Sequence, residues 1–232
     1  EQAAGGWDLS ARLANRFCHL SWSLDTAGWI DGMIQGWQTP SVPRLPEGWQ
    51  GFIPASRGLV ASFIRHRPHL LLQVPQSEEQ AGKAWPSPRS WDMAARLLAA
   101  CDAAQAGDDV AASLVAGCVG EGAGMEFLAW RKALDLPDPE EVLRNPGKFR
   151  VPERGDQAFA VLTAVVSAAV RNLTRGRWLA AWQVLAKAAE QGAKDIAAAS
   201  AKALAAARKP GLPVPQKELR EFIPLLQKGG LM

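Results

Sequence analysis

The segment 155-GDQAFAVLTAVVSAAVRN-172 is the clearest indication that this chain is built from helices. Its apolar part, residues 158–170, is rich in alanine and is interrupted by Thr163 and Ser167. It is too short to cross a bilayer. The segment therefore predicts a helix in the core of a globular domain.

Two further helical segments and a short tail helix are expected after it. They are RGRWLAAWQVLAKAAEQG (175–192), KDIAAASAKALAAARK (194–209) and PQKELREFIPLLQKGG (215–230). Glycines or prolines separate all four segments. The segments 155–172, 175–192 and 194–209 are therefore expected to form three antiparallel helices, followed by the short tail helix. The alanine-rich segment 194–209 has high helix propensity but few large side chains to bury.

The chain before this bundle is expected to start with a loop, a short helix and a strand, and then to become helical. The strand is predicted at Phe17–Trp22, where side chains alternate between two faces. Apolar residues at helical spacing predict a helix over residues 25–37. Further helices are expected at residues 56–67, 90–105 with Ser90 as a candidate N-cap, 108–120 and 124–134. Connectors rich in proline and glycine near residues 38–54 and 145–152 predict boundaries.

The composition of the 232 residues, with 48% apolar and 21% charged side chains, is that of an ordinary globular protein. No export signal or membrane span is recognised. The three cysteines are odd in number and widely spaced, so we expect buried free thiols, no metal site and a reducing, cytoplasmic location.

Charge is unevenly distributed along the chain. Residues 1–140 carry 11 Lys and Arg against 16 Asp and Glu, whereas residues 141–232 carry 15 against 7. A basic C-terminal part is compatible with an acidic partner or nucleic acid. The positive residues are, however, scattered at about one per helical turn with little aromatic interleaving, which is more typical of a solvated helix face.

The chain lacks the motifs of a complete active site. It contains no G-x-x-x-x-G-K-[ST] loop and no apolar strand that ends in an acidic pair, so the usual phosphate cradle and magnesium-binding acids are missing. The glycine-rich stretch GEGAG (120–124) follows a helical pattern, and it is interpreted as a turn between two helices.

Two arginines stand out as candidate functional residues. Arg16 ends the short helix before the predicted strand, and Arg89 lies in WPSPRSW, in the first turn of a helix, where the helix dipole disfavours a positive charge. A guanidinium suits phosphate oxygens because it is planar and permanently charged. The alternative for either residue is a surface or interface salt bridge.

Both arginines lie in motifs that resemble MoxR-type AAA+ ATPases. DLSARLANRFCHLSW (8–22) resembles the segment after the fourth core strand of that family, where an N/D-R-F triplet precedes the fifth strand; Asn15, Arg16 and Phe17 match the triplet. FIRHRPHLL and WPSPRSWDMAARLL resemble the helical lid, in which a P-R pair, here Pro88 and Arg89, opens the sensor-2 helix. The resemblance covers about residues 1–145. The region after residue 150 resembles an extra helical tail of some bacterial members.

This resemblance implies a mainly α chain with a remnant of an α/β core. Residues 1–50 would be the end of that core with one short strand, residues 51–145 the lid, and residues 146–232 a C-terminal helical extension. Arg16 would be the arginine finger that reaches the nucleotide of a neighbouring subunit, and Arg89 the sensor-2 arginine that touches the nucleotide of its own subunit. The parent protein would bind ATP and Mg²⁺, form a homo-oligomeric ring, expected to be a hexamer, and remodel or mature a protein client.

In this family, the nucleotide-binding loop and the magnesium-binding acids precede the region matched by residue 1. We therefore expect a fragment of a longer ATPase or a truncated gene product, and no ATP hydrolysis by these residues alone. The rival hypothesis is a non-enzymatic helical interaction module, and a weaker third one is nucleic-acid binding by the basic tail.

Overall fold

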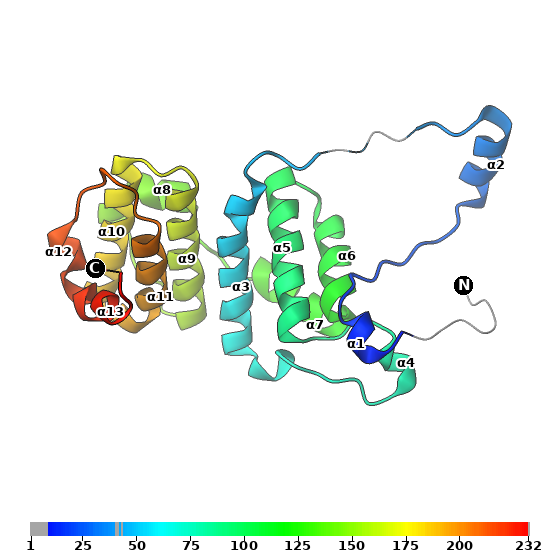
Figure 1. Ribbon diagram of the computed structural model, residues 1–232, viewed down its shortest axis with the longest axis horizontal. Helices are drawn as coiled ribbons and strands as arrows, with labels where there is room; N and C mark the ends of the chain where they lie inside the picture. Colours follow the sequence, from blue (N-terminus) through cyan, green and yellow to red (C-terminus); the bar gives the residue numbers. More distant parts are fainter. Residues whose placement is uncertain (1–8, 40–41, 43, 232) are drawn as a thin grey trace.

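The computed structural model describes residues 9–39, 42 and 44–231, and this part of the chain is mainly helical (Figure 1). The N-terminal half contains α1 (Ala11–Ala14), α2 (Thr26–Gln35), η1 (Trp49–Phe52), α3 (Ile53–His66), η2 (Pro68–Leu70), α4 (Glu78–Ala81), α5 (Pro88–Ala104), α6 (Asp108–Val119) and α7 (Glu121–Lys132). The C-terminal half contains α8 (Pro139–Arg144), η3 (Pro146–Lys148), α9 (Gly155–Arg171), α10 (Arg175–Glu190), α11 (Lys194–Ala206), α12 (Gln216–Leu219), η4 (Arg220–Phe222) and α13 (Ile223–Lys228). None of these helices is both long enough and apolar enough to cross a membrane.

The helices α8–α13 pack around one hydrophobic cluster. Trp178 and Trp182, one turn apart on α10, are fully buried with their rings edge to face at 5.8 Å, and Phe222 packs against Trp182. Helix α9 presents Val161, Leu162 and other apolar side chains to this cluster. The helices predicted from 155–172, 175–192 and 194–209 are thus confirmed. The cluster begins at α8, before the connector at residues 145–152.

A second hydrophobic cluster joins α3, α5, α6 and α7. Its centre is aromatic: the ring of Phe63 contacts those of Trp91, Phe127 and Trp130 at centroid distances of 5.3 to 5.6 Å. The N-cap of helix α5 is Ser87, whose side chain accepts a hydrogen bond from the backbone N–H of Ser90. The expected N-cap at Ser90 was wrong, because Ser90 occupies the third helical position and completes a capping box.

The two clusters are joined through α3 and α9, which lie side by side (Figure 1). The helices approach closely at Gly58, where a Cβ atom would lie 2.3 Å from Cγ2 of Thr163. One turn further along α3, the buried hydroxyl of Ser62 donates to the carbonyl of Asp156 at 2.6 Å, and Trp130 Nε1 donates to Oδ2 of the same residue at 3.0 Å. These contacts connect α3 and α7 to the start of α9.

The predicted strand at Phe17–Trp22 is not formed, and no strand occurs in the part of the chain that the structure describes. The segment is extended and lies against α6 instead: the N–H of His19 donates to the carbonyl of Gly117 at 2.7 Å. That carbonyl is in the last turn of α6 and has no partner within the helix. A strand needs neighbouring strands to satisfy its remaining backbone groups, and none lies beside this segment among the described residues.

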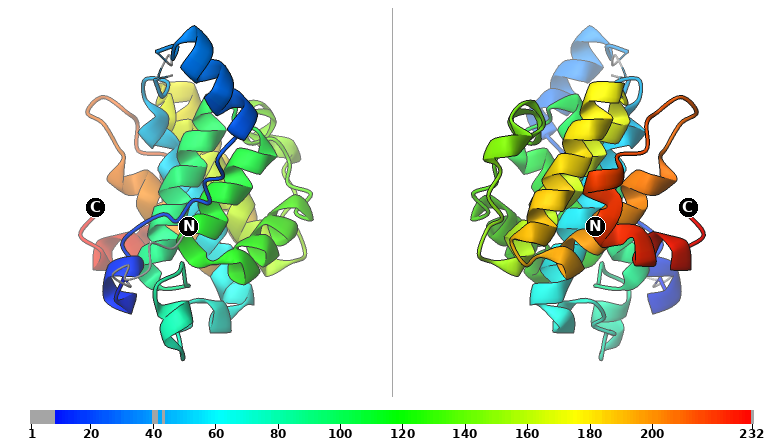
Figure 2. Two further views of the ribbon diagram at one scale, coloured as in Figure 1. Left: turned by 90° about the vertical axis from the view of Figure 1, so that its right-hand side faces the viewer. Right: turned by 90° about the vertical axis from the view of Figure 1, so that its left-hand side faces the viewer.

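Helix α2 lies apart from both clusters, at the end of extended connections (Figures 1 and 2). It forms where the sequence predicts, with the Asp25 side chain accepting from the N–H of Ala27 as N-cap. None of its residues is buried. We use the term α2 apolar face for its exposed large hydrophobic side chains, which are Trp29, Ile30, Met33 and Ile34.

Candidate functional site

The two segments that carry the predicted site residues meet at Asn15. This side chain is only 4% exposed. Its Nδ2 donates to the carbonyl of Trp85 at 2.9 Å, and its Oδ1 accepts from the hydroxyl of Ser87 at 2.6 Å. Both hydrogen-bonding groups of the amide are therefore used to hold the end of α1 against the loop that opens α5.

Two more hydrogen bonds fix α1 in this position. Trp85 Nε1 donates to the carbonyl of Ala11 at 3.3 Å, and the Nε2 atom of His19 lies 2.9 Å from the carbonyl of Ala14. A four-residue helix has little intrinsic stability, so these tertiary contacts are what keep it formed. We call this arrangement the Asn15 junction; it comprises Asn15, Trp85 and Ser87.

Arg16 and Arg89 flank the Asn15 junction, each within two residues of one of its members. Both side chains are exposed to solvent. Within residues 9–39, 42 and 44–231, neither guanidinium forms an ion pair. The alternative role of Arg16 and Arg89, a salt bridge at the surface, is thus not seen within the described chain. The structure leaves both charges available to a group outside it.

The start of α5 is electrostatically positive. Arg89 is the second residue of the helix, the first turn contains no acidic residue, and Asp92 one turn later is paired with Arg57 at 2.7 Å. The N-terminus of a helix carries a partial positive charge, but here Pro88 has no N–H and the N–H of Ser90 is already bound by Ser87. The guanidinium of Arg89, rather than the backbone, is therefore the group at this end that can attract an anion such as a phosphate.

The turn expected over GEGAG (120–124) is reduced to Gly120, because residues 121–124 already form the first turn of α7. Gly120 ends α6 and begins α7 with φ of +83°, a conformation that glycine adopts without strain. A side chain there would meet the carbonyl of Ala84 at 2.9 Å. The stretch therefore positions α7 beside the loop that leads to Trp85.

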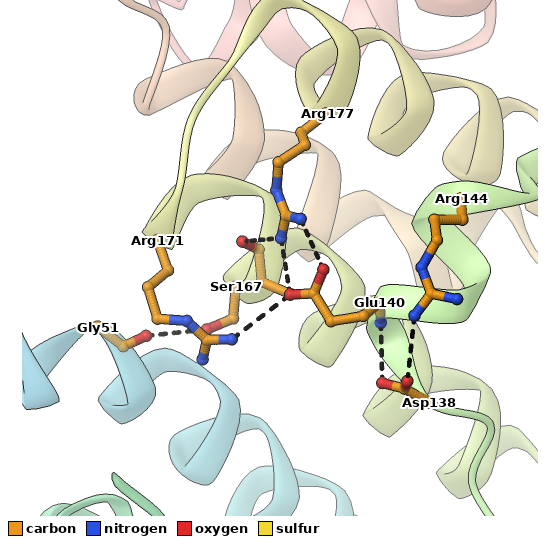
Figure 3. Close-up of polar contacts among 8 residues, drawn as sticks. Gly51, Asp138, Glu140, Arg144, Ser167, Arg171 and Arg177 are labelled. Atoms are coloured by element: carbon orange, nitrogen blue, oxygen red, sulfur yellow. Dashed lines mark hydrogen bonds and ion pairs between the residues drawn. The ribbon is translucent and has the colours of Figure 1, made fainter.

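A second polar cluster, which sequence reasoning missed, surrounds Glu140 (Figure 3). Arg177 forms two hydrogen bonds to its carboxylate at 2.6 and 2.8 Å, and Arg171 lies 3.6 Å from it. Arg177 also donates to the carbonyl of Ala168 at 2.7 Å. These residues come from α8, α9 and α10, and no sequence spacing brings them together.

The arginines of this cluster lower the pKa of Glu140. The hydrogen bonds from Arg177 lower the pKa of Glu140 below its usual value of 4.5; partial burial opposes this effect, and the charges of Arg171 and Arg144 reinforce it. Arg144 lies 4.0 Å from Asp138, at the start of α8. The cluster thus ties α8 to α9 and α10, and its main role is structural.

The cysteines do not form a site for chemistry. Cys18 lies against α6, where its Sγ donates to the carbonyl of Leu114 at 3.5 Å, and it is close to Cys118. Burial raises the pKa of both thiols, which keeps them protonated. Among the residues that the structure describes, no group of three or more His, Cys, Asp or Glu side chains is placed to hold a metal ion.

Comparisons of the chain with protein-family models, with curated proteins and with solved structures found no match.

Proposed function

We propose that these residues belong to a cytoplasmic, ring-forming AAA+ ATPase of the MoxR type, which uses ATP to remodel or mature a protein partner. The 232 residues contain no G-x-x-x-x-G-K-[ST] sequence, so the phosphate loop of this proposal comes from polypeptide outside them. These residues would supply two arginines, a helical lid and a C-terminal helical extension.

The observation that carries this proposal is the Asn15 junction. The two family-like motifs are 70 residues apart in sequence, yet Asn15 of the first is hydrogen-bonded to Trp85 of the second. Arg16 and Arg89 are thereby held at one end of α5, exposed and without ion-pair partners in the described chain. A guanidinium suits phosphate oxygens, and the shared framework fixes the backbone positions of the two arginines relative to each other, as is needed for one to act on its own subunit's nucleotide and the other on a neighbour's.

The exposed apolar side chains before the lid also support a larger assembly. Trp22 is 95% exposed and Leu20 60% exposed, in the segment whose alternation favours a strand. The α2 apolar face is likewise uncovered. Exposed hydrophobic groups of this kind mark surfaces that other polypeptide covers. In the proposal, an α/β core and neighbouring subunits of a hexameric ring cover them.

The proposed chemistry of the two arginines is electrostatic. Phosphoryl transfer develops charge on the γ-phosphate oxygens, and ATP with Mg²⁺ supplies the reacting group when bound. Arg16 is assigned to the γ-phosphate bound by the neighbouring subunit, and Arg89 to the nucleotide of its own subunit. Since Arg16 acts across the subunit interface, assembly and nucleotide state are coupled.

The test is ATP turnover by a protein that contains these residues together with their phosphate loop. Arg16→Ala is expected to reduce kcat by a factor of about 10³–10⁵, as for other arginine fingers, while nucleotide binding is largely retained. Arg12→Ala is the matched control, because Arg12 is an exposed arginine in α1, four residues before Arg16 and outside the N-R-F triplet. Normal hydrolysis by Arg16→Ala would remove the assignment.

A non-enzymatic interaction module is the second candidate, and the α2 apolar face favours it. A module of this kind binds a protein through exposed hydrophobic residues and needs no phosphate loop. The DNA upstream of the Glu1 codon separates the two candidates. An in-frame G-x-x-x-x-G-K-[ST] sequence supports the ATPase, and a stop codon directly upstream supports the module.

A further inference from the structure

A groove of about 350 Å³ runs between α9, α11 and the start of α3. Its walls are mainly apolar, with Phe159, Thr163, Val166 and Val170 from α9 and Ala199 and Ala203 from α11. Its α9 wall extends from Phe159 to Arg171, which is about 18 Å at the rise of an α-helix. The groove is therefore elongated along α9, and its residues lie far along the chain from those of the Asn15 junction.

The groove exists because α11 offers only small side chains on this side. Ala199 and Ala203 line the groove with methyl groups alone, and the large residue Leu204 belongs to the hydrophobic cluster instead, where it is fully buried. The space is thus a direct consequence of the alanine-rich segment 194–209. Apolar spaces of this size, with a few placed polar groups, are typical of small-molecule sites.

Two polar groups of the groove have hydrogen-bonding capacity to spare. Ser200 is 3% exposed, and its buried hydroxyl has no hydrogen-bond partner among the described residues. A buried hydroxyl without a partner costs free energy, so it favours a ligand that brings a polar atom or a water.

The second polar group is Arg171, at the end of the α9 wall (Figure 3). Its guanidinium is held above the Phe52 ring at 4.2 Å, which fixes its position. The carboxylate nearest to it, Glu140, is already bound by Arg177 through two hydrogen bonds, and its 3.6 Å separation from Arg171 is too long for another. Arg171 and Arg177 thus share the single carboxylate of Glu140, so one positive charge is left over and Arg171 keeps N–H donors for a further anion.

We propose that this groove binds a single-chain amphiphile with a carboxylate head, such as a free fatty acid. The apolar chain lies along α9 and α11, a water bound beside it satisfies the hydroxyl of Ser200, and the carboxylate pairs with Arg171. The charge of Arg171 selects the anionic head, and the length of the apolar α9 wall selects an extended chain over a compact ring system.

The experiment is isothermal titration calorimetry of the whole chain with dodecanoate below its micellar concentration. Dodecanol and dodecyltrimethylammonium are the matched neutral and cationic probes. Dodecanoate is expected to bind at one site, at least about tenfold more tightly than dodecanol, a difference that corresponds to about 1.4 kcal/mol. Absence of dodecanoate binding, or equal affinity for the cationic probe, would overturn the proposal.

Two variants test the assignment inside the groove. Arg171→Gln is expected to weaken dodecanoate binding about tenfold and to leave dodecanol binding unchanged, whereas Arg175→Gln, an exposed arginine in the next helix, changes neither. Ala203→Leu fills the groove and is expected to abolish binding of both probes, whereas Ala206→Leu, on α11 outside the groove lining, has no effect. Thermal unfolding verifies that each variant is folded. Undiminished binding by folded Ala203→Leu contradicts the site.

Discussion

The side-chain amide of Asn15 donates a hydrogen bond to the main-chain carbonyl of Trp85 at 2.9 Å, across 70 residues of sequence. The amide is buried, and the hydroxyl of Ser87 donates to its oxygen. This pair connects α1 to the loop that starts α5, and it holds Arg16 and Arg89 on one framework. The geometry of both candidate site residues thus depends on a neighbour that is itself neither charged nor catalytic.

Asn15→Ala is expected to destabilise the protein by about 1–3 kcal/mol, because it leaves the buried Trp85 carbonyl and Ser87 hydroxyl without their partner. Denaturant unfolding measures the change. Asn172→Ala is the control, because Asn172 is exposed and makes no side-chain hydrogen bond within the described residues. An unchanged free energy of unfolding in Asn15→Ala would show that the Asn15 junction does not stabilise the folded protein.

Gly117→Ala is expected to detach the Cys18–His19 segment from α6. The new Cβ atom would lie 2.3 Å from the carbonyl oxygen of His19 and 2.9 Å from Cys18 Sγ, so the segment must move. Hydrogen exchange at the His19 amide should then become faster. Gly122→Ala is the matched control: it lies in α7 with open space around it and should stabilise the protein by roughly 0.5–1 kcal/mol. Unchanged protection of the His19 amide in Gly117→Ala would contradict the contact.

Stability is expected to fall in acid through Asp156 and Glu140. Burial opposes ionisation of Asp156, but hydrogen bonds from Arg154 and Trp130 lower its pKa below the usual 3.8, and Arg177 lowers that of Glu140 below the usual 4.5. A carboxyl group with a lowered pKa in the folded state stabilises the protein above its unfolded-state pKa. That stability is lost as the pH falls through the folded-state value.

The measurement is the free energy of unfolding from denaturant titrations between neutral pH and pH values below these usual pKa values. Asp156→Asn and Glu140→Gln should each show a smaller decrease in acid than the wild type. Glu153→Gln serves as control, because Glu153 is exposed and forms no ion pair within the described chain. A variant curve parallel to that of the wild type would exclude the carboxyl group concerned.

Substitutions on the α2 apolar face are expected to leave folding stability almost unchanged. Met33→Ser or Ile34→Ser should change the free energy of unfolding by no more than about 0.5 kcal/mol, as for other exposed positions, and should reduce self-association at high protein concentration. Trp178→Ala, in the buried centre of the bundle, should cost about 3–5 kcal/mol. Equilibrium unfolding and light scattering test both expectations. A large loss of stability in Met33→Ser would mean that the face is buried in solution.

Much of the local structure follows from the sequence alone. The apolar spacing and the bounding glycines and prolines predict α9, α10 and α11, because these determinants act within a few residues of each other. The same is true of the N-cap at Asp25 and of the turn at Gly120, where a short polar side chain and the conformational freedom of glycine decide the outcome. The two arginines are likewise predicted as site residues by local criteria, namely their position at a helix end and the motif around each of them.

Tertiary structure decided what these segments contact. The alternation at Phe17–Trp22 predicts a strand, but a strand depends on hydrogen bonds to other strands. In the folded chain the His19 amide donates instead to the carbonyl of Gly117 in the last turn of α6. Helix α2 has a clear apolar face, yet helical spacing cannot show whether anything covers it. The Asn15 junction and the Glu140 cluster join residues from distant segments, as does the groove beside α11. No local sequence pattern encodes these contacts, because they form only when whole helices pack against one another.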